Sequence, residues 1–302
     1  MTPRWIAQVE RSNLLALRAL VSIASVLGRR IGHWLLYPIC MYFLIFSLNA
    51  RRASKQYLTR AFGRPARWHE VFQHYLTFAK VALDRIFLLS DRDDLFDIRT
   101  FGEQPVLDMA AKKQGAILLG AHLGSFEVLR AVSQRRRGTV VQMLMFEENA
   151  RKLNAVLSKI NANFKSNIIG LGKLDSMLKI SEHIEAGELI GILGDRGISE
   201  AGQIAVPFFG DDAKFPDSPF RLAAMLRCPV YLMVGLYRGG NRYDLYFEPL
   251  IDGAPVGRNE RDRVMRSWQR HYVERLEHYC RIAPYNWFNF YDFWNSDDDT
   301  KT

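Results

Sequence analysis

The sequence predicts an α/β fold with a largely parallel or mixed central sheet flanked by helices. Short apolar segments of strand length alternate with longer segments in which apolar residues recur at helical spacing. Two of the apolar segments end in glycine-containing loops, and open α/β sheets bind ligands at such strand ends. Hydrophobic residues make up 48% of the 302 residues, which is enough for one sizeable core.

The first part of the chain is apolar and carries basic pairs. Residues 12–28 and 31–48 are both apolar, and basic pairs at 29–30 and 51–52 bracket the second stretch. That stretch is marginal for a bilayer span of about 20 residues, and a proline interrupts it. We therefore expect residues 1–52 to form membrane-associating helices that insert in one leaflet or lie at the interface. A full span and an ordinary buried helix pair are the alternatives.

The rest of the chain is expected to form one domain over residues 53–294, followed by a polar tail at 295–302. Helical spacing predicts helices at 53–63, 67–90, 106–113, 125–134, 149–161, 174–186, 215–228 and 259–282. Apolar or alternating runs predict strands at 96–101, 116–119, 139–145, 188–193, 229–236 and 242–248.

The segment GAILLGAHLGSFEVLR, residues 115–130, is the first candidate site. It is expected to form a buried strand, a tight loop and the start of a helix, with Gly124 or Ser125 as the N-cap. His122 lies in the loop and Glu127 in the first helical turn, so the spacing is H-x4-E. A carboxylate at this spacing can reach back to the imidazole, fix its tautomer and make it a general base. The other interpretation is structural: Glu127 complements the helix dipole and His122 satisfies a backbone carbonyl.

A second glycine-containing loop, Gly194-Asp195-Arg196-Gly197, ends the strand at 188–193. It should face the same crevice as His122, because the carboxyl ends of parallel strands meet at one edge of a sheet. Arg196 is expected to bind a carboxylate or phosphate, or to offset charge on an oxyanion, with Asp195 holding the arginine. A structural Asp–Arg pair in a tight turn is the alternative.

The bulk composition limits the class of partner. Forty-one Lys and Arg against 32 Asp and Glu give a formal charge of +9, which favours an anionic partner such as a membrane surface or an acidic carrier. No nucleic-acid-binding signature occurs, so nucleic acid is not expected. The three cysteines are widely separated, which disfavours a zinc site or a disulfide framework.

Three segments in order resemble the lysophospholipid acyltransferase superfamily. They are GAHLGSFEVLR with its H-x4-E box, GELIGILGDRG at 187–197, and IAVPFFG at 204–210. The nearest branch is the lipid A late acyltransferases (lauroyl and myristoyl transferases), together with relatives that accompany aryl polyene pathways. The resemblance runs from about residue 35 to residue 294 and includes the aromatic APYNWFNFYDFW at its end.

The resemblance implies a glycerolipid acyltransferase-like fold and an acyltransferase domain at 53–294. It implies catalytic His122 and Glu127, and substrate contacts from Gly124, Ser125, Asp195, Arg196 and Arg151. The donor would be an acyl carrier protein or coenzyme A thioester, with no bound cofactor and no metal. The acceptor would be a lipid hydroxyl or amine, at the cytoplasmic face of a bacterial inner membrane. Backbone amides near Gly124 and Ser125, or Arg196, would stabilise the oxyanion.

One departure from the resemblance bears on the acceptor. Lipid A acyltransferases carry an arginine in a Tyr-Arg-Pro segment, whereas the matching stretch here is MLMFEEN, residues 143–149, and Arg151 is out of register. This favours another lipid, such as an aryl polyene conjugate or an aminolipid. A lipid hydrolase that uses the same His–Glu pair on water, and a non-catalytic membrane scaffold, are the other functions the sequence allows.

Overall fold

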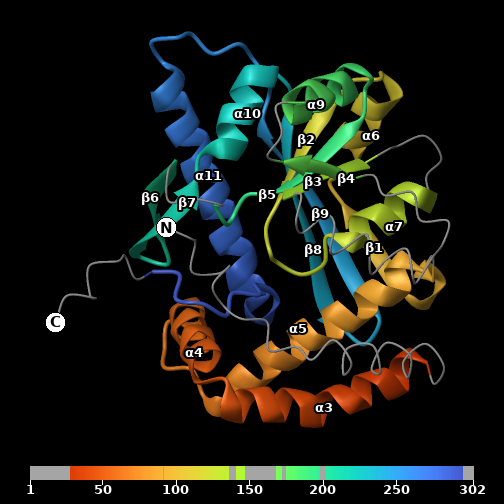
Figure 1. Ribbon diagram of the computed structural model, residues 1–302, viewed down its shortest axis with the longest axis vertical. Coiled ribbons are helices and arrows are strands. Elements are labelled where there is room, and N and C mark those ends of the chain that lie inside the picture. The colour runs from red at the N-terminus through yellow and green to blue at the C-terminus, as the bar shows by residue number, and fades with distance from the viewer. Residues whose placement is uncertain are drawn as a thin grey trace.

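A seven-stranded sheet forms the centre of the molecule (Figure 1). The computed structural model describes residues 28–90, 92–135, 141–146, 168–171, 175–197 and 202–294. Within them the strand order is β1-β9-β8-β2-β5-β3-β4, and only β8 and β9 pair antiparallel in this sheet. The predicted α/β class with a largely parallel sheet is confirmed. The strands are β1 Asp97–Phe101, β2 Ala116–Gly120, β3 Val141–Phe146, β4 Ile168–Leu171, β5 Leu189–Leu193, β8 Val230–Gly239 and β9 Arg242–Ile251.

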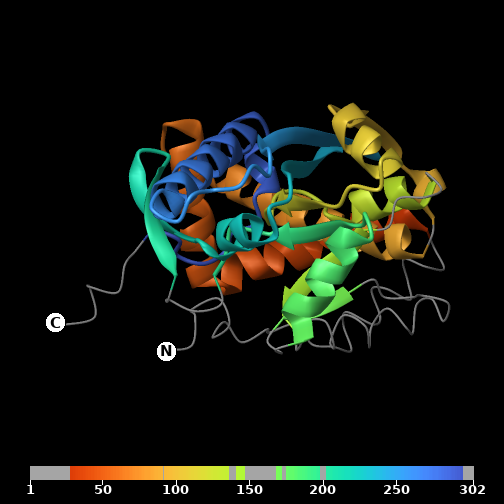
Figure 2. The same ribbon diagram turned by 90° about the horizontal axis from the view of Figure 1, so that it is seen from above.

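Helices cover both faces of this sheet. Figures 1 and 2 show α10 and α11 on one side, and α6 and α7 on the other. These helices are α6 Gln104–Ala111, α7 Glu127–Arg135, α9 Asp175–Glu185, α10 Ser218–Leu226 and α11 Arg261–Ile282. The central strands are buried because of this cover: all five residues of β2 and the first eight of β8 are buried. This burial explains why both read as continuous apolar runs in the sequence.

Three further helices lie below the sheet in Figure 1, at the edge where β2, β5 and β8 end. They are α3 Arg29–Phe46, α4 Leu48–Phe62 and α5 Trp68–Leu89. Two local signals set their bounds: α4 ends at Gly63, which has a φ of 64°, and the Glu70 side chain accepts a hydrogen bond from the Arg67 amide (2.7 Å) at the start of α5. A short aromatic segment that includes the 3-10 turn η2, Pro284–Asn286, runs between these helices and the sheet.

Helix α3 buries only a narrow stripe. Gly32, Leu36, Cys40 and Leu44, each four residues apart, are its buried positions. Much of the apolar remainder is exposed: Ile31, Trp34, Leu35, Tyr37, Ile39, Met41, Tyr42, Ile45 and Phe46. Among the described residues no single helix is long and apolar enough to span a bilayer, and α3 with α4 passes that test only as a pair bent by 97°.

One local prediction was wrong, two further strands were not predicted, and other predictions fall outside the described residues. The helix expected from residue 215 begins at Ser218, because residues 211–216 form β7 and pair with β6, Gln203–Phe208. The four-residue edge strand β4 and the strand β6 were not predicted. The segments 1–27, 149–161 and 295–302 lie outside the described residues, so the predictions made for them and the domain bounds stay predictions.

Candidate active site

His122 lies in the loop that joins β2 to α7, and two other segments hold this loop in place. Its carbonyl oxygen accepts a hydrogen bond from the Phe288 amide (2.8 Å), and Leu123 forms an antiparallel bridge with Trp287. On the other side, Gly124 forms a parallel bridge with Gly235 of β8. The loop is therefore held on both sides, as a strand within a sheet would be.

Gly124 is required here by its backbone. Its φ is 69°, and a Cβ at this position would overlap the Gly235 carbonyl oxygen. The Gly124 amide donates to the Asn286 carbonyl (2.8 Å) and the Ser125 amide donates to the Gly235 carbonyl (2.7 Å). Both amides expected to stabilise an oxyanion are thus already bonded, and they position the loop instead.

The His122 imidazole is paired with Asp195. Residues Gly120 and Leu193 face each other in the parallel pair of β2 and β5, and His122 and Asp195 each follow their strand by two residues. This register brings Nδ1 of His122 to 2.8 Å from Oδ1 of Asp195. Because an ionised carboxylate only accepts, Nδ1 carries a proton, and in the neutral imidazole Nε2 then has the free lone pair. Nε2 has no hydrogen-bond partner among the described residues, and the His122 side chain is 37% exposed.

Asp195 is fully buried, and its second oxygen is also occupied. The Trp287 indole N–H donates to Oδ2 (3.1 Å), so the two carboxylate oxygens accept from two ring nitrogens. Burial alone would raise the pKa of Asp195. The charge and hydrogen bond of His122, with the nearby Arg196 guanidinium, outweigh burial and hold that pKa well below its usual range. Asp195 therefore stays ionised and fixes the tautomer of His122.

Glu127 has different partners from the one expected. Its carboxylate forms an ion pair with Nε of Arg85 on α5 (2.7 Å) and accepts a hydrogen bond from the Ser125 hydroxyl (3.1 Å). No hydrogen bond or ion pair joins Glu127 to His122 in this structure. Asp195 is therefore the carboxylate that contacts the His122 imidazole, the contact that the H-x4-E spacing predicted for Glu127. Glu127 instead links the start of α7 to α5 through its ion pair with Arg85.

Arg196 lies beside this pair. Its Nη2 donates to the Phe288 carbonyl (2.6 Å), its guanidinium carbon lies 5.2 Å from the centre of the Tyr291 ring, and its Nε is 3.9 Å from Oδ2 of Asp195. Nε is buried without a hydrogen-bond partner in the described part of the chain. The Arg196 guanidinium therefore places a positive charge beside the His122–Asp195 pair. Arg151, the other predicted arginine, lies outside the described residues.

The comparison with protein families bears on this arrangement. The model of the bacterial lipid A biosynthesis acyltransferases matches residues 44–295, which include both glycine-containing loops and the aromatic segment. The chain belongs to this family. It is therefore an enzyme that transfers acyl groups, with an acyl donor and a lipid acceptor. No curated protein matches the chain.

In this member of the lipid A acyltransferase family, a buried histidine fixes the backbone of Trp287. His74 of α5 donates from Nε2 to the Trp287 carbonyl (2.8 Å), and its Nδ1 accepts from the Ser54 hydroxyl (2.8 Å). Burial lowers the pKa of His74 to about 4, and the hydrogen bond to Trp287 offsets this only in part. His74 is therefore neutral at physiological pH. Its hydrogen bond to the Trp287 carbonyl positions Trp287, and the Trp287 indole in turn donates to Asp195.

Sequence reasoning missed Trp287, His74 and Arg85. Trp287 lies in the aromatic segment that the resemblance included, and a tryptophan surrounded by aromatics is usually a core residue. A buried Trp needs a partner for its N–H, and this was the one signal that pointed toward Asp195.

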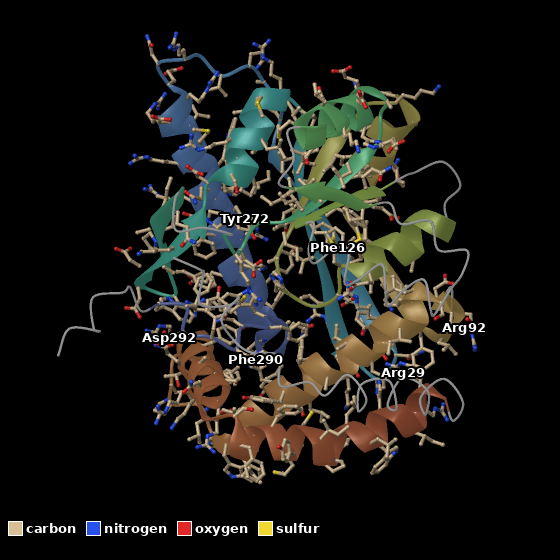
Figure 3. The ribbon with its side chains drawn as sticks, viewed as in Figure 1. Arg29, Arg92, Phe126, Tyr272, Phe290 and Asp292 are labelled. Carbon is tan, nitrogen blue, oxygen red and sulfur yellow. The ribbon has the colours of Figure 1, made fainter. Side chains whose placement is uncertain are left out.

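Tyr272 of α11 contacts the strand that leads to His122, since its hydroxyl donates to the Gly120 carbonyl (2.9 Å; Figure 3). The described residues hold no group of three or more His, Cys, Asp or Glu that could bind a metal.

Proposed function

We propose that this enzyme moves an acyl chain from an acyl carrier protein or coenzyme A thioester to a hydroxyl or amine of a lipid, with His122 as the general base. The single observation that carries the proposal is the orientation of His122: Asp195 accepts from Nδ1, which leaves Nε2 unprotonated on a side chain that is 37% exposed. A neutral imidazole in this state accepts a proton from an attacking nucleophile, which contributes roughly 10²–10⁴ in rate.

The reaction balances without a covalent enzyme intermediate. The acceptor oxygen or nitrogen attacks the thioester carbonyl carbon while Nε2 of His122 takes its proton. The tetrahedral intermediate collapses, the C–S bond breaks, and the imidazolium returns the proton to the departing thiolate. The products are an acylated lipid and a free thiol. Asp195, ionised and fully buried, stabilises the imidazolium between the two proton transfers.

In the proposal Arg196 supplies the positive charge for the oxyanion. The amides of Gly124 and Ser125 are already bonded, whereas the Arg196 guanidinium lies beside the His122–Asp195 pair, with Nε 3.9 Å from Asp195. Glu127 acts by positioning, because it joins the Ser125 hydroxyl to Arg85.

The enzyme is further proposed to work at the cytoplasmic face of a bacterial inner membrane. The support is the exposed apolar surface of α3, in which Trp34 is 75% and Phe46 59% exposed. Helix α3 lies at the edge of the sheet that carries His122 (Figure 1), so a lipid acceptor would not have to leave the bilayer far to reach the imidazole. The missing arginine in MLMFEEN, residues 143–149, favours an acceptor other than a lipid A precursor, such as an aryl polyene conjugate or an aminolipid.

The test is lipid and thioester mass spectrometry on cells that express the wild type or His122→Ala. A lipid heavier by one acyl group, present with the wild type and absent with the variant, is the expected result and identifies the acceptor. Release of free fatty acid without an acylated lipid would instead show a hydrolase. Identical lipid profiles in the two strains would contradict catalysis and favour a scaffold.

A further inference from the structure

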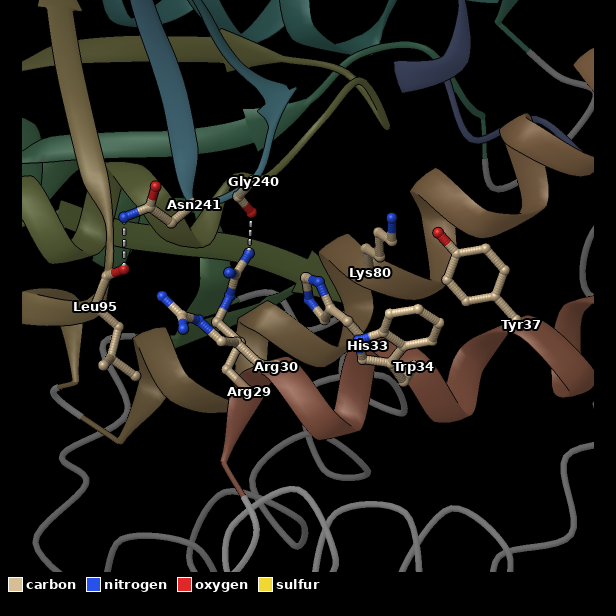
Figure 4. A pocket seen from close by; sticks show the side chains of 9 residues that line it. All are labelled: Arg29, Arg30, His33, Trp34, Tyr37, Lys80, Leu95, Gly240 and Asn241. Atoms are coloured by element: carbon tan, nitrogen blue, oxygen red, sulfur yellow. Dashed lines mark hydrogen bonds between the residues drawn. The ribbon is translucent and has the colours of Figure 1, made fainter.

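A basic cavity of about 530 Å³ lies between α3, α5 and the turn that joins β8 to β9. Figure 4 shows Arg30, His33 and Trp34 on α3, and Lys80 on the neighbouring helix α5. The turn contributes Gly240, close to the end of β8. The volume falls within the range of small-molecule sites. The cavity does not include His122 or Asp195, so the acyl-transfer site does not account for it.

One of the residues that line the cavity, Arg29, is neutralised by an ion pair with Asp84, which does not itself line the cavity. Asp84, fully buried, accepts two hydrogen bonds from Arg29 (2.6 and 2.7 Å), one from the Tyr243 hydroxyl (2.8 Å), and contacts Nε2 of His33 (2.9 Å). Arg29 also donates to the Gly240 carbonyl (2.6 Å). The negative charge of Asp84 is therefore used within this pair and does not cancel the other cations of the cavity.

Arg30 and Lys80 remain as uncompensated charges. In the described part of the chain neither forms a hydrogen bond or an ion pair, and Lys80 contacts only the face of the Tyr37 ring, at 5.4 Å. Two carboxylates near the cavity pair with arginines of their own: Asp94 lies 3.2 Å from Arg92, and Asp97 3.0 Å from Arg99. Two positive charges in one cavity favour an anion that carries several oxygens.

The surroundings of the cavity indicate where that anion comes from. Trp34 and Tyr37 line the cavity and also belong to the exposed apolar surface of α3. Tryptophan and tyrosine beside basic residues are typical of the membrane–water interface, where the ring lies at headgroup depth and the cation contacts phosphate. A soluble anion would gain nothing from the apolar surface next to the cavity.

We infer that this cavity binds the headgroup phosphate of an anionic membrane lipid, with Arg30 and Lys80 as its charged ligands. The inference rests on the membrane association proposed above and adds a preference for one lipid class. Five residues separate Gly235, which holds the His122 loop, from Gly240, and at about 3.3 Å per residue the cavity lies roughly 16 Å from that loop along β8. A lipid bound there would orient the enzyme with its acyl-transfer site beside the bilayer surface.

Vesicle binding tests the inference without any acyl transfer. Wild type and Arg30→Gln/Lys80→Gln are compared on vesicles of phosphatidylcholine alone and on vesicles with equal parts phosphatidylglycerol. Each charge near a membrane surface is worth about 1 kcal/mol, so the double variant should bind the anionic vesicles about 30-fold more weakly. Its binding to neutral vesicles should be unchanged. Both side chains are at least partly exposed, so folding is expected to be retained.

The chain offers a matched control. A second basic cavity of the same volume, about 530 Å³, includes Arg258 and Arg261 at the start of α11, at the end of the molecule away from α3 in Figure 1. Both arginines are exposed, and neither has an ion pair within the described residues. Arg258→Gln/Arg261→Gln should change binding to anionic vesicles by less than about 3-fold. Equal losses in the two double variants would show general charge attraction and overturn the inference.

Two further outcomes separate the possible failures. Competition by millimolar inorganic phosphate at constant ionic strength would show a site for a soluble phosphate and overturn the lipid assignment. Absence of wild-type binding to both kinds of vesicle would contradict the proposed membrane association as well. Wild-type protein that binds both kinds of vesicle equally well would contradict only the headgroup site.

Discussion

Replacing Asp195 with Asn should remove the proposed base function of His122 while leaving the fold intact. Asp195 is fully buried and accepts from His122 Nδ1 at 2.8 Å and from the Trp287 indole at 3.1 Å. An asparagine offers one oxygen and one NH₂ group. Turning the NH₂ group toward the indole would set two donors against each other in the core, which costs about 1–3 kcal/mol. The amide oxygen therefore faces Trp287 and the NH₂ group faces His122.

That orientation reverses the tautomer of the imidazole. Nδ1 must now accept, so the proton moves to Nε2, the atom that would take the proton of the acceptor. The full value of general-base catalysis is lost, and we expect kcat to fall roughly 10²–10⁴-fold. Because the two hydrogen bonds around residue 195 are kept in number, the free energy of unfolding should fall by less than about 2 kcal/mol.

The assay follows thiol release from an acyl thioester by purified enzyme in mixed micelles with lipid extract, and mass spectrometry of the product. Glu127→Gln is the control, since Gln can still accept from the Ser125 hydroxyl and loses only the ion pair with Arg85, whose side chain is 38% exposed. We expect that variant to keep kcat within about tenfold. If Glu127→Gln were as inactive as His122→Ala while Asp195→Asn kept most of its activity, Glu127 would be the working partner of His122 and our assignment would be wrong.

Three further perturbations probe the support of the site. Trp287→Phe removes one donor to Asp195 and part of a fully buried side chain. We expect kcat to fall about tenfold and the free energy of unfolding, measured by urea denaturation, to fall by roughly 2–4 kcal/mol. An unchanged kcat would contradict the positioning role of Trp287. Because His74 has a pKa of about 4 folded and about 6.5 unfolded, unfolding takes up a proton between these values, and stability should fall by about 3 kcal/mol as the pH drops from 6.5 to 4. The same titration of His74→Gln should lack that slope, and an equal slope would assign it to other groups. Gly124→Ala places a Cβ against the Gly235 carbonyl oxygen at a φ of 69°, so the loop must move. Acyl transfer should be lost even where circular dichroism shows a folded chain. Full activity would show that the loop tolerates the shift.

The sequence was sufficient to predict a largely parallel sheet, though not its edge strand β4, and the edge at which the site lies. Strands such as β2 and β5 are continuous apolar runs because helices bury both faces of the sheet, and their carboxyl ends carry His122 and Asp195. That the two residues lie at the same edge of the sheet followed from parallel strands alone. Their direct pairing depends on the register that sets Gly120 opposite Leu193, and this register is not visible in either strand by itself.

The partner of Glu127 could not be predicted, because it comes from another element. The H-x4-E spacing makes Glu127 the nearest carboxylate to His122 along the chain. Its carboxylate instead forms an ion pair with Arg85 of α5, which lies forty-two residues earlier in the sequence. The strand β7 was missed for a similar reason. Phe215 appeared to begin a helix, whereas its ring is fully buried against Phe208 of β6, a tertiary contact that overrides local propensity.

The segment that holds the His122 loop has a consequence for the synthesis of the protein. Asn286, Trp287 and Phe288 bond to Gly124, Asp195 and His122, more than ninety residues away in every case. A ribosome adds about 5–20 residues per second, so the sheet strands β2 and β5 leave it several seconds before the residues that complete the catalytic geometry. A nascent chain can therefore begin to fold before these contacts to the His122 loop exist. On the proposed mechanism, acyl transfer would begin only after residues 286–288 have bound to the His122 loop and to Asp195.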